Sequence, residues 1–187
     1  MIIARLVAVA VHATACATPN FIPVRVSSVQ MVPQSDFTYP KAPADVLAIV
    51  QQSFQTRGFP VVDQRQITPS VRYYVFQGPR QHVTSTKGYV GRYGGTITSE
   101  NYVIGSWFLV RISGSDSSTN LFIMGKPTVN NTAVCSDADA RLKESDYFCS
   151  DTKIQEGAPE WPLVTGKEEA DTAKGVIIEL EQAMGKP

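Results

Sequence analysis

The strongest strand signal in this chain is Tyr102-Val103-Ile104-Gly105-Ser106-Trp107-Phe108-Leu109-Val110-Arg111-Ile112-Ser113. Successive side chains of an extended strand point to opposite faces, so this stretch divides into two sets. The first set is mostly apolar and contains Ile104, Ser106, Phe108, Val110 and Ile112. The second set contains Trp107, Leu109 and Arg111. A small polar turn at 114–118 and an apolar run at 121–124 follow, and the whole pattern predicts a β-hairpin.

Shorter strand signals precede this stretch. Residues 59–64 and 71–77 are rich in β-branched and aromatic residues, which favour strands. Asp36-Phe37-Thr38-Tyr39 predicts a brief additional strand. The segment from Gly78 to Ser99 is rich in glycine and tyrosine and is expected to be a loop, with Gly94-Gly95 as a turn between strands.

A first helix is predicted to begin at Pro43 and to end before Gly58. Proline suits the first helical position because its missing N–H is not needed there. Asp45 is favoured at the positive end of the helix dipole, and Gly58 suits the left-handed position that ends a helix. Apolar residues recur at helical spacing: Val46, Ile49, Val50 and Phe54.

A second helix is predicted near the end of the chain. Thr165 and Glu168 have the spacing of a capping box, and Gly185 is expected to terminate the helix. The apolar residues of this helix share one face: Ala170, Ala173, Val176, Ile177, Leu180 and Met184.

The order of these elements is strand, helix, several strands, helix. This order predicts an α+β fold in which an antiparallel sheet carries two main helices on one face. Residues 35–187 have the size of a single domain. The chain contains 17 Lys and Arg and 17 Asp and Glu, and this balance argues against a nucleic-acid binder.

Residues 1–15 have the composition of an export signal. Arg5 is followed by a short apolar run, and Ala13-Thr14-Ala15 precede Cys16. These residues resemble the lipobox of bacterial lipoproteins, whose cysteine is acylated, for example with palmitate, and becomes the mature N-terminus. The resemblance implies a signal peptide at 1–15, a lipidated Cys16 and a lipid-anchored tether at 16–34. A plain secretory signal cut after Ala15 and a structural N-terminal strand remain as alternatives.

The chain contains three cysteines, Cys16, Cys135 and Cys149. An odd number in an exported protein leaves one thiol over, and acylation of Cys16 would leave the other two as a pair. A disulfide between Cys135 and Cys149 encloses a loop of about 15 residues, which chain entropy values at about 3 kcal/mol. Two unrelated reduced cysteines are the alternative.

A second resemblance concerns the passage around the first helix. Phe37-Thr38-Tyr39-Pro40, Ala44-Asp45-Val46 and Arg57-Gly58-Phe59-Pro60-Val61 resemble the helix-grip domains of small outer-membrane lipoproteins. The barrel-assembly accessory lipoproteins are one such group. The resemblance implies a helix-grip-like sheet and a partner-binding module without a catalytic motif. Ala17, directly after Cys16, resembles an outer-membrane sorting signal.

Few residues indicate catalysis or a metal site. His82 is the only histidine after the signal peptide, and no nucleophile motif accompanies it. The acidic residues at 137–146 lack the glycine of a calcium loop and are expected to form a solvated loop. No catalytic residue, metal or cofactor is assigned, and the chain is predicted not to be an enzyme.

Partner contacts are assigned to aromatic and arginine residues, which are enriched at protein interfaces. Tyr89, Arg92 and Tyr93 lie in the glycine- and tyrosine-rich segment, and Trp161 precedes the final helix. An ordinary mobile hairpin end is the alternative for that segment.

The sequence therefore favours a lipoprotein of the outer membrane that faces the periplasm and acts as an interaction or assembly module. Its partners would be an envelope protein and, through the lipid anchor, the membrane. The alternative is a periplasmic carrier that holds a small apolar ligand between sheet and helices. The residues expected to line such a cavity are Tyr73, Phe76, Trp107 and Phe122.

Overall fold

The predicted hairpin forms strands β6 (Gly94–Ser115) and β7 (Ser118–Val129). In the computed structural model these strands pair antiparallel from Ile104↔Val129 to Ser115↔Ser118. β6 begins well before the stretch that the sequence indicates. The structure describes residues 21–26, 36–92, 94–135, 144, 149, 153–156 and 163–185.

The turn of this hairpin requires a glycine at position 114. Gly114 has a φ of +148°, and a Cβ at this position would lie 2.0 Å from the carbonyl oxygen of Ser118. Other residues rarely adopt this backbone conformation. The close approach of the two strands at the turn therefore depends on the absence of a side chain.

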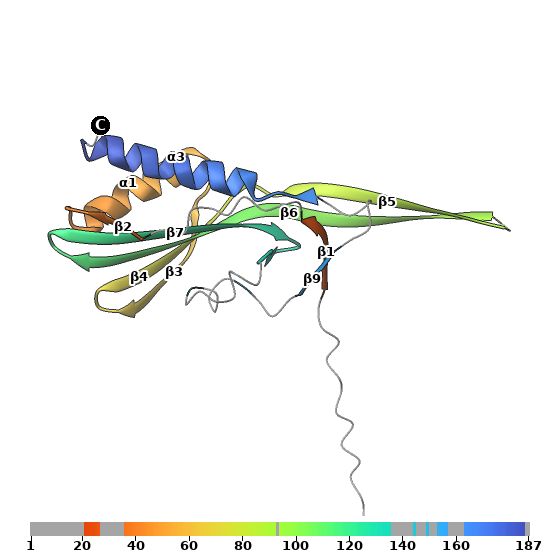
Figure 1. Ribbon diagram of the computed structural model, residues 1–187, viewed down its shortest axis with the longest axis horizontal. Helices are drawn as coiled ribbons and strands as arrows, with labels where there is room; N and C mark the ends of the chain where they lie inside the picture. The colour runs from red at the N-terminus through yellow and green to blue at the C-terminus, as the bar shows by residue number, and fades with distance from the viewer. Residues whose placement is uncertain are drawn as a thin grey trace, which may run out of the picture.

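Seven strands form the main sheet, and their pairings are antiparallel (Figure 1). β2, β7, β6, β4 and β3 follow one another across the sheet, while β5 pairs with β6 and β8 pairs with β7. The bounds are β2 Asp36–Tyr39, β3 Val61–Thr68, β4 Val71–Gln77, β5 Gln81–Gly91 and β8 Thr132–Ala133. The predicted α+β class with an antiparallel sheet is confirmed.

The two helices are α1 (Pro43–Thr56) and α3 (Lys167–Ala183). α1 begins with proline in its first turn, as predicted. The predicted capping box of α3 is wrong by one residue, because Gly166 occupies the N-cap with a φ of 65° and makes no side-chain cap. Thr165 lies one position earlier, where its hydroxyl accepts a hydrogen bond from the N–H of Lys167 at 3.3 Å. No helix within the described ranges is long and apolar enough to cross a membrane.

Both helices pack against the same face of the main sheet (Figure 1). An aromatic cluster lies at the centre of this layer, where the ring of Phe54 on α1 stacks on Phe76 with centroids 4.3 Å apart. Phe108 lies 5.0 Å from the Phe54 ring and meets Phe59 edge to face. α3 adds its apolar face to the same core: Ala173, Val176 and Leu180. The predicted apolar stripes of both helices are thus the residues that cover the sheet.

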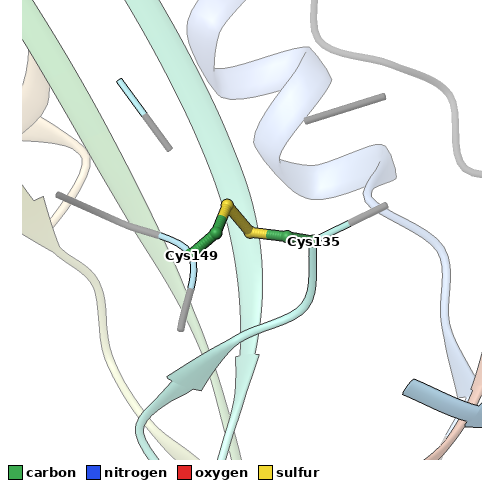
Figure 2. The surroundings of a disulfide bond; sticks show 2 residues. All are labelled: Cys135 and Cys149. Carbon is green, nitrogen blue, oxygen red and sulfur yellow. A yellow bond between two sulfur atoms is a disulfide. The ribbon is translucent and has the colours of Figure 1, made fainter. Parts of the chain in front are cut away.

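The opposite face of the sheet carries a second, smaller apolar cluster. Its buried members are Tyr73, Leu109, Phe122, Met124 and Ala133, with Cys135 packed against them. Figure 2 shows that Cys135, just after β8, is bonded to Cys149. The predicted disulfide is confirmed, with Cα atoms 5.8 Å apart.

Arg111 lies on this second face and joins two distant segments of the chain. Its guanidinium pairs with the carboxylates of Glu144, inside the disulfide loop, and of Asp36 on β2. The same group lies 5.1 Å from the ring centroid of Phe122. A charged residue in the predicted apolar hairpin therefore has a structural role.

Three further strands form a small parallel sheet that is separate from the main sheet. β1 (Phe21–Val26) pairs with β9 (Lys153–Glu156) on one side and with β10 (Leu163–Val164) on the other. Residues 21–26 fall inside the predicted tether at 16–34 and are a strand. The sequence suggests a short edge strand at 24–31, which overlaps β1 but does not specify its pairing, because the partners of β1 lie about 130 positions away along the chain.

Candidate partner-binding arm and the pocket at its base

A long two-stranded arm, residues 82–103, extends from the main sheet beyond the helices (Figure 1). β5 and β6 pair without interruption from Gln81↔Ile104 to Gly91↔Gly94. β7 pairs with β6 only from Ile104 onward. Over the length of the arm, β5 is therefore the only described partner of β6.

Asn130 marks the base of the arm. Its N–H donates to the carbonyl of Val103 at 2.8 Å, and its side-chain Oδ1 accepts from the N–H of Val103 at 2.9 Å. Asn130 and Asn131 have φ values of 50° and 65°, a conformation that asparagine tolerates in tight turns. The turn leads the chain into β8, and this ends the pairing of β7 along β6.

The predicted loop between Gly78 and Ser99 is wrong, because most of this segment is strand. Strand formation depends on packing and pairing with neighbours more than on local composition. Here the glycines are interspersed with threonine, valine and tyrosine, and each strand supplies the other's backbone partners. The prediction of a turn at Gly94-Gly95 is close, since the chain reverses between Gly91 and Gly94.

The arm is anchored at its inner end, and many of its described side chains further out are exposed. Tyr102 is buried and its hydroxyl donates to the carboxylate of Glu100. Further out, the hydroxyl of Thr84 donates to Oδ1 of Asn101 across the two strands at 2.9 Å. Ile97 is 75% exposed, which is unusual for a large aliphatic side chain. These features make the outer arm a candidate contact surface.

Two of the residues predicted to contact a partner lie at the outer end of the arm. Tyr89 lies on β5 opposite Thr96, and Arg92 lies exposed in the turn. Tyr93 and Trp161 fall outside the described residues, as does Cys16, the predicted lipidation site.

The four aromatic residues expected to line a carrier cavity do not share one face. Phe76 belongs to the core under the helices, whereas Tyr73 and Phe122 belong to the cluster on the opposite face. Trp107 also packs against that second cluster. Alternation along the strands separates them, because Tyr73 and Phe76 are three positions apart on β4.

A pocket of about 340 Å³, here called the basal pocket, lies where the arm meets the N-terminal end of α3. Its lining comes from the β4–β5 connection with the first residue of β5, from β6 just inside the arm, from β7, and from the first turn of α3 with the two residues before it. The residues are Pro79, Arg80, Gln81, Ile104, Gly105, Ser106, Pro127, Thr165, Gly166, Glu168 and Glu169.

A buried carboxylate lines this pocket. Glu169 is 3% exposed and accepts a hydrogen bond from the hydroxyl of Ser106, which is 4% exposed. Burial raises the pKa of the Glu169 carboxyl above its ordinary value, and the hydrogen bonds from Ser106 and from its own backbone N–H oppose that shift. Lys126, also buried, contributes a smaller opposing charge.

Other titratable groups of the described residues form no comparable site. His82 lies exposed on β5, and no group of three or more His, Cys, Asp or Glu among the described residues is placed to hold a metal ion.

Sequence reasoning did not identify Glu169 and Ser106 as site residues, although a feature of the sequence marks each of them. Ser106 is the one polar residue on the apolar face of the predicted strand, where a buried hydroxyl needs a partner. Glu169 becomes the third residue of α3 once the helix start moves to Lys167. Their meeting depends on how α3 crosses the sheet, which neither pattern specifies.

No protein-family model matches the chain, and no curated protein matches it. One similar solved structure is the crystal structure of a DUF4468 family protein from Bacteroides ovatus, at 10% identity and a TM-score of 0.35. The alignment covers 82% of this chain and 85% of that one.

Proposed function

We propose that this protein is a non-catalytic, lipid-anchored interaction module of the bacterial cell envelope, and that it binds an envelope protein through the arm. The observation that carries this proposal is the arm itself, a two-stranded ribbon that extends beyond the helix-covered sheet. The two helices on one face of an antiparallel sheet also support the helix-grip-like sheet that the second resemblance implies.

A two-stranded ribbon is at best marginally stable in water without a third strand or a packed face. Strand edges also offer unpaired N–H and C=O groups to other chains. Proteins often block such edges with proline or several charges, but β5 has no proline and Lys87 is the one Lys, Arg, Asp or Glu among its 11 residues. The arm therefore suits a partner that adds a strand to it.

The membrane anchor would hold the folded body close to the lipid surface. Because β1 begins at Phe21, four residues separate it from Cys16. Fully extended, a segment of this length spans at most about 18 Å. A lipidated Cys16 would thus keep the start of β1 near the membrane, where an envelope partner is available.

Site-specific photocrosslinking in the producing cells tests the proposal. A photoreactive residue replaces Ile97 on the arm or Val62 on β3, which is also exposed, at 52%. We expect one discrete membrane-protein adduct from position 97 and none of that mass from position 62. Equal adducts from both positions, or none from position 97, would exclude the arm as the binding element.

The anchor is tested separately by the intact mass of the protein purified from membranes. We expect a chain that begins at Cys16 and carries acyl chains, and we expect Cys16→Ser to release the protein from the membrane. A chain that begins at Met1 would contradict the anchor while leaving the crosslinking result interpretable.

A further inference from the structure

The basal pocket combines an enclosed carboxylate with a second carboxylate at its surface. Glu169 is almost completely buried, and Glu168, its neighbour in the first turn of α3, is exposed. Arg80, the one cationic residue that lines the pocket, is exposed to solvent. The lining therefore carries more negative than positive charge, with the negative charge at its most buried point.

Burial of a carboxylate is unfavourable unless the charge is compensated. The hydroxyl of Ser106 is a neutral donor, and the charge of Lys126 has the smallest of the effects on the Glu169 carboxyl, so these two groups offset only part of this cost. A cationic group that enters the pocket and reaches Glu169 would form the stronger, charge-assisted hydrogen bond.

We propose that the basal pocket binds a single ammonium or guanidinium group, with Glu169 as its counter-ion and Glu168 as a second, outer carboxylate. The volume of about 340 Å³ lies at the lower end of the range of small-ligand sites. Thr165 and Gly166 line the same pocket and add a hydroxyl and main-chain atoms to its wall.

An anion is the less suitable occupant. The N-terminal end of a helix usually attracts anions, because its first N–H groups are unpaired. In α3 the first turn already carries Glu168 and Glu169, whose charges repel a second anion.

The cationic group has two sources, a free small amine or a basic side chain of the protein partner. Gln81 and Ile104 line the pocket and form the last residue pair before the arm begins. A strand added along the arm would therefore pass the pocket and could place a Lys or Arg side chain in it. This assignment of the source rests on the proposed function, whereas the cation site itself does not.

An NMR titration of the full chain with n-butylammonium and with n-butylguanidinium tests the site. We expect saturable shifts of the backbone amides of Ser106 and Glu169, and affinity at least about tenfold weaker in Glu169→Gln. Glutamine keeps an acceptor for Ser106, so the variant is expected to fold, and its thermal melting verifies this. Asp171→Asn removes one negative charge from the exposed side of the same helix and should leave the affinity unchanged.

Glu168→Gln provides a second variant, for which we expect a smaller loss of affinity. Equal binding of the amines by Glu169→Gln and the unchanged chain would overturn the proposal. Saturable binding of acetate at the same amides, without binding of amines, would also overturn it.

An arm-trimmed variant separates the cation site from the proposed function. In this variant Val83 is joined to Tyr102 through Asn-Gly, which keeps Gln81, Ile104 and the pocket. We expect this variant to bind the amines with unchanged affinity and to lose the crosslinked partner.

A peptide titration decides the source of the cation. If the partner supplies it, the peptide acetyl-Thr-Val-Lys-Val-Thr-amide should bind more tightly than n-butylammonium and should also shift the backbone amides of β5. Equal affinity and no β5 shifts would assign the site to a free amine.

Discussion

Arg57 and Glu179 join the two helices through a bidentate ion pair. Two guanidinium nitrogens of Arg57 donate to the two carboxylate oxygens of Glu179, at 2.9 and 2.7 Å. The hydroxyl of Ser53 donates to the same carboxylate at 2.5 Å. Gly175 on α3 leaves room for the arginine, since a Cβ there would lie 2.8 Å from its Nη2. One polar cluster thus fixes α3 against the end of α1.

The Arg57–Glu179 pair makes the free energy of unfolding decrease at acidic pH. Hydrogen bonds from Arg57 and Ser53 lower the pKa of Glu179 from 4.5 to about 2. The stabilisation is therefore present above pH 4.5 and is lost as the pH falls toward 2. Because Glu179 is partly exposed, we expect Glu179→Gln to cost about 1 kcal/mol at pH 7 and to cost little at pH 2.

Urea denaturation of the two chains at both pH values measures this difference. Asp171→Asn is the matched control, since its ion pair with Lys167 is fully on the surface of the same helix. A cost of Glu179→Gln that does not change with pH would contradict the assigned role of the ion pair.

Tyr39 makes the free energy of unfolding decrease at alkaline pH. Burial, and secondarily the charge of Glu181, raises the pKa of Tyr39 from 10.0 to about 12. Between these values the unfolded chain loses a proton that the folded chain keeps, so stability falls as the pH rises. We expect the unfolding free energy to decrease between pH 10 and 12, and to decrease less in Tyr39→Phe. Identical slopes for the two chains would show that Tyr39 ionises as readily in the folded state.

Phe54 is the residue through which α1 holds the sheet. It is fully buried and contacts the rings of Phe59, Phe76 and Phe108. We expect Phe54→Ala to cost about 3 to 5 kcal/mol in unfolding free energy, because it leaves a cavity between helix and sheet. Val62→Ala on exposed β3 should stay within about 0.5 kcal/mol of the unchanged chain.

The disulfide holds the loop that supplies Glu144 to Arg111. We expect reduction, or replacement of Cys135 and Cys149 by alanine, to lower the unfolding free energy by about 3 kcal/mol. Because Cys135 packs against the cluster around Leu109 and Met124, loss of the bond should also increase the amide exchange of β6 and β7. Protection equal to that of the oxidised chain would show that the bonded Cys135 does not stabilise this face.

The sequence by itself determined the elements whose signals are local. The apolar stripe and Pro43 specified α1, the alternation in 102–113 and Gly114 specified the hairpin, and the cysteine count predicted the disulfide. Each of these signals lies within one element or one pair of residues. The α+β class followed from their order.

Only the tertiary structure decided which distant groups meet. The arm is strand because β5 and β6 pair over their whole length, although the glycines of the segment predicted a loop. β1 is strand because β9 and β10 lie beside it. Ser106 meets Glu169, and Arg57 meets Glu179, because α3 crosses one face of the sheet beside α1. Such contacts depend on the angles and registers of packed elements, which periodicity along a single chain does not encode.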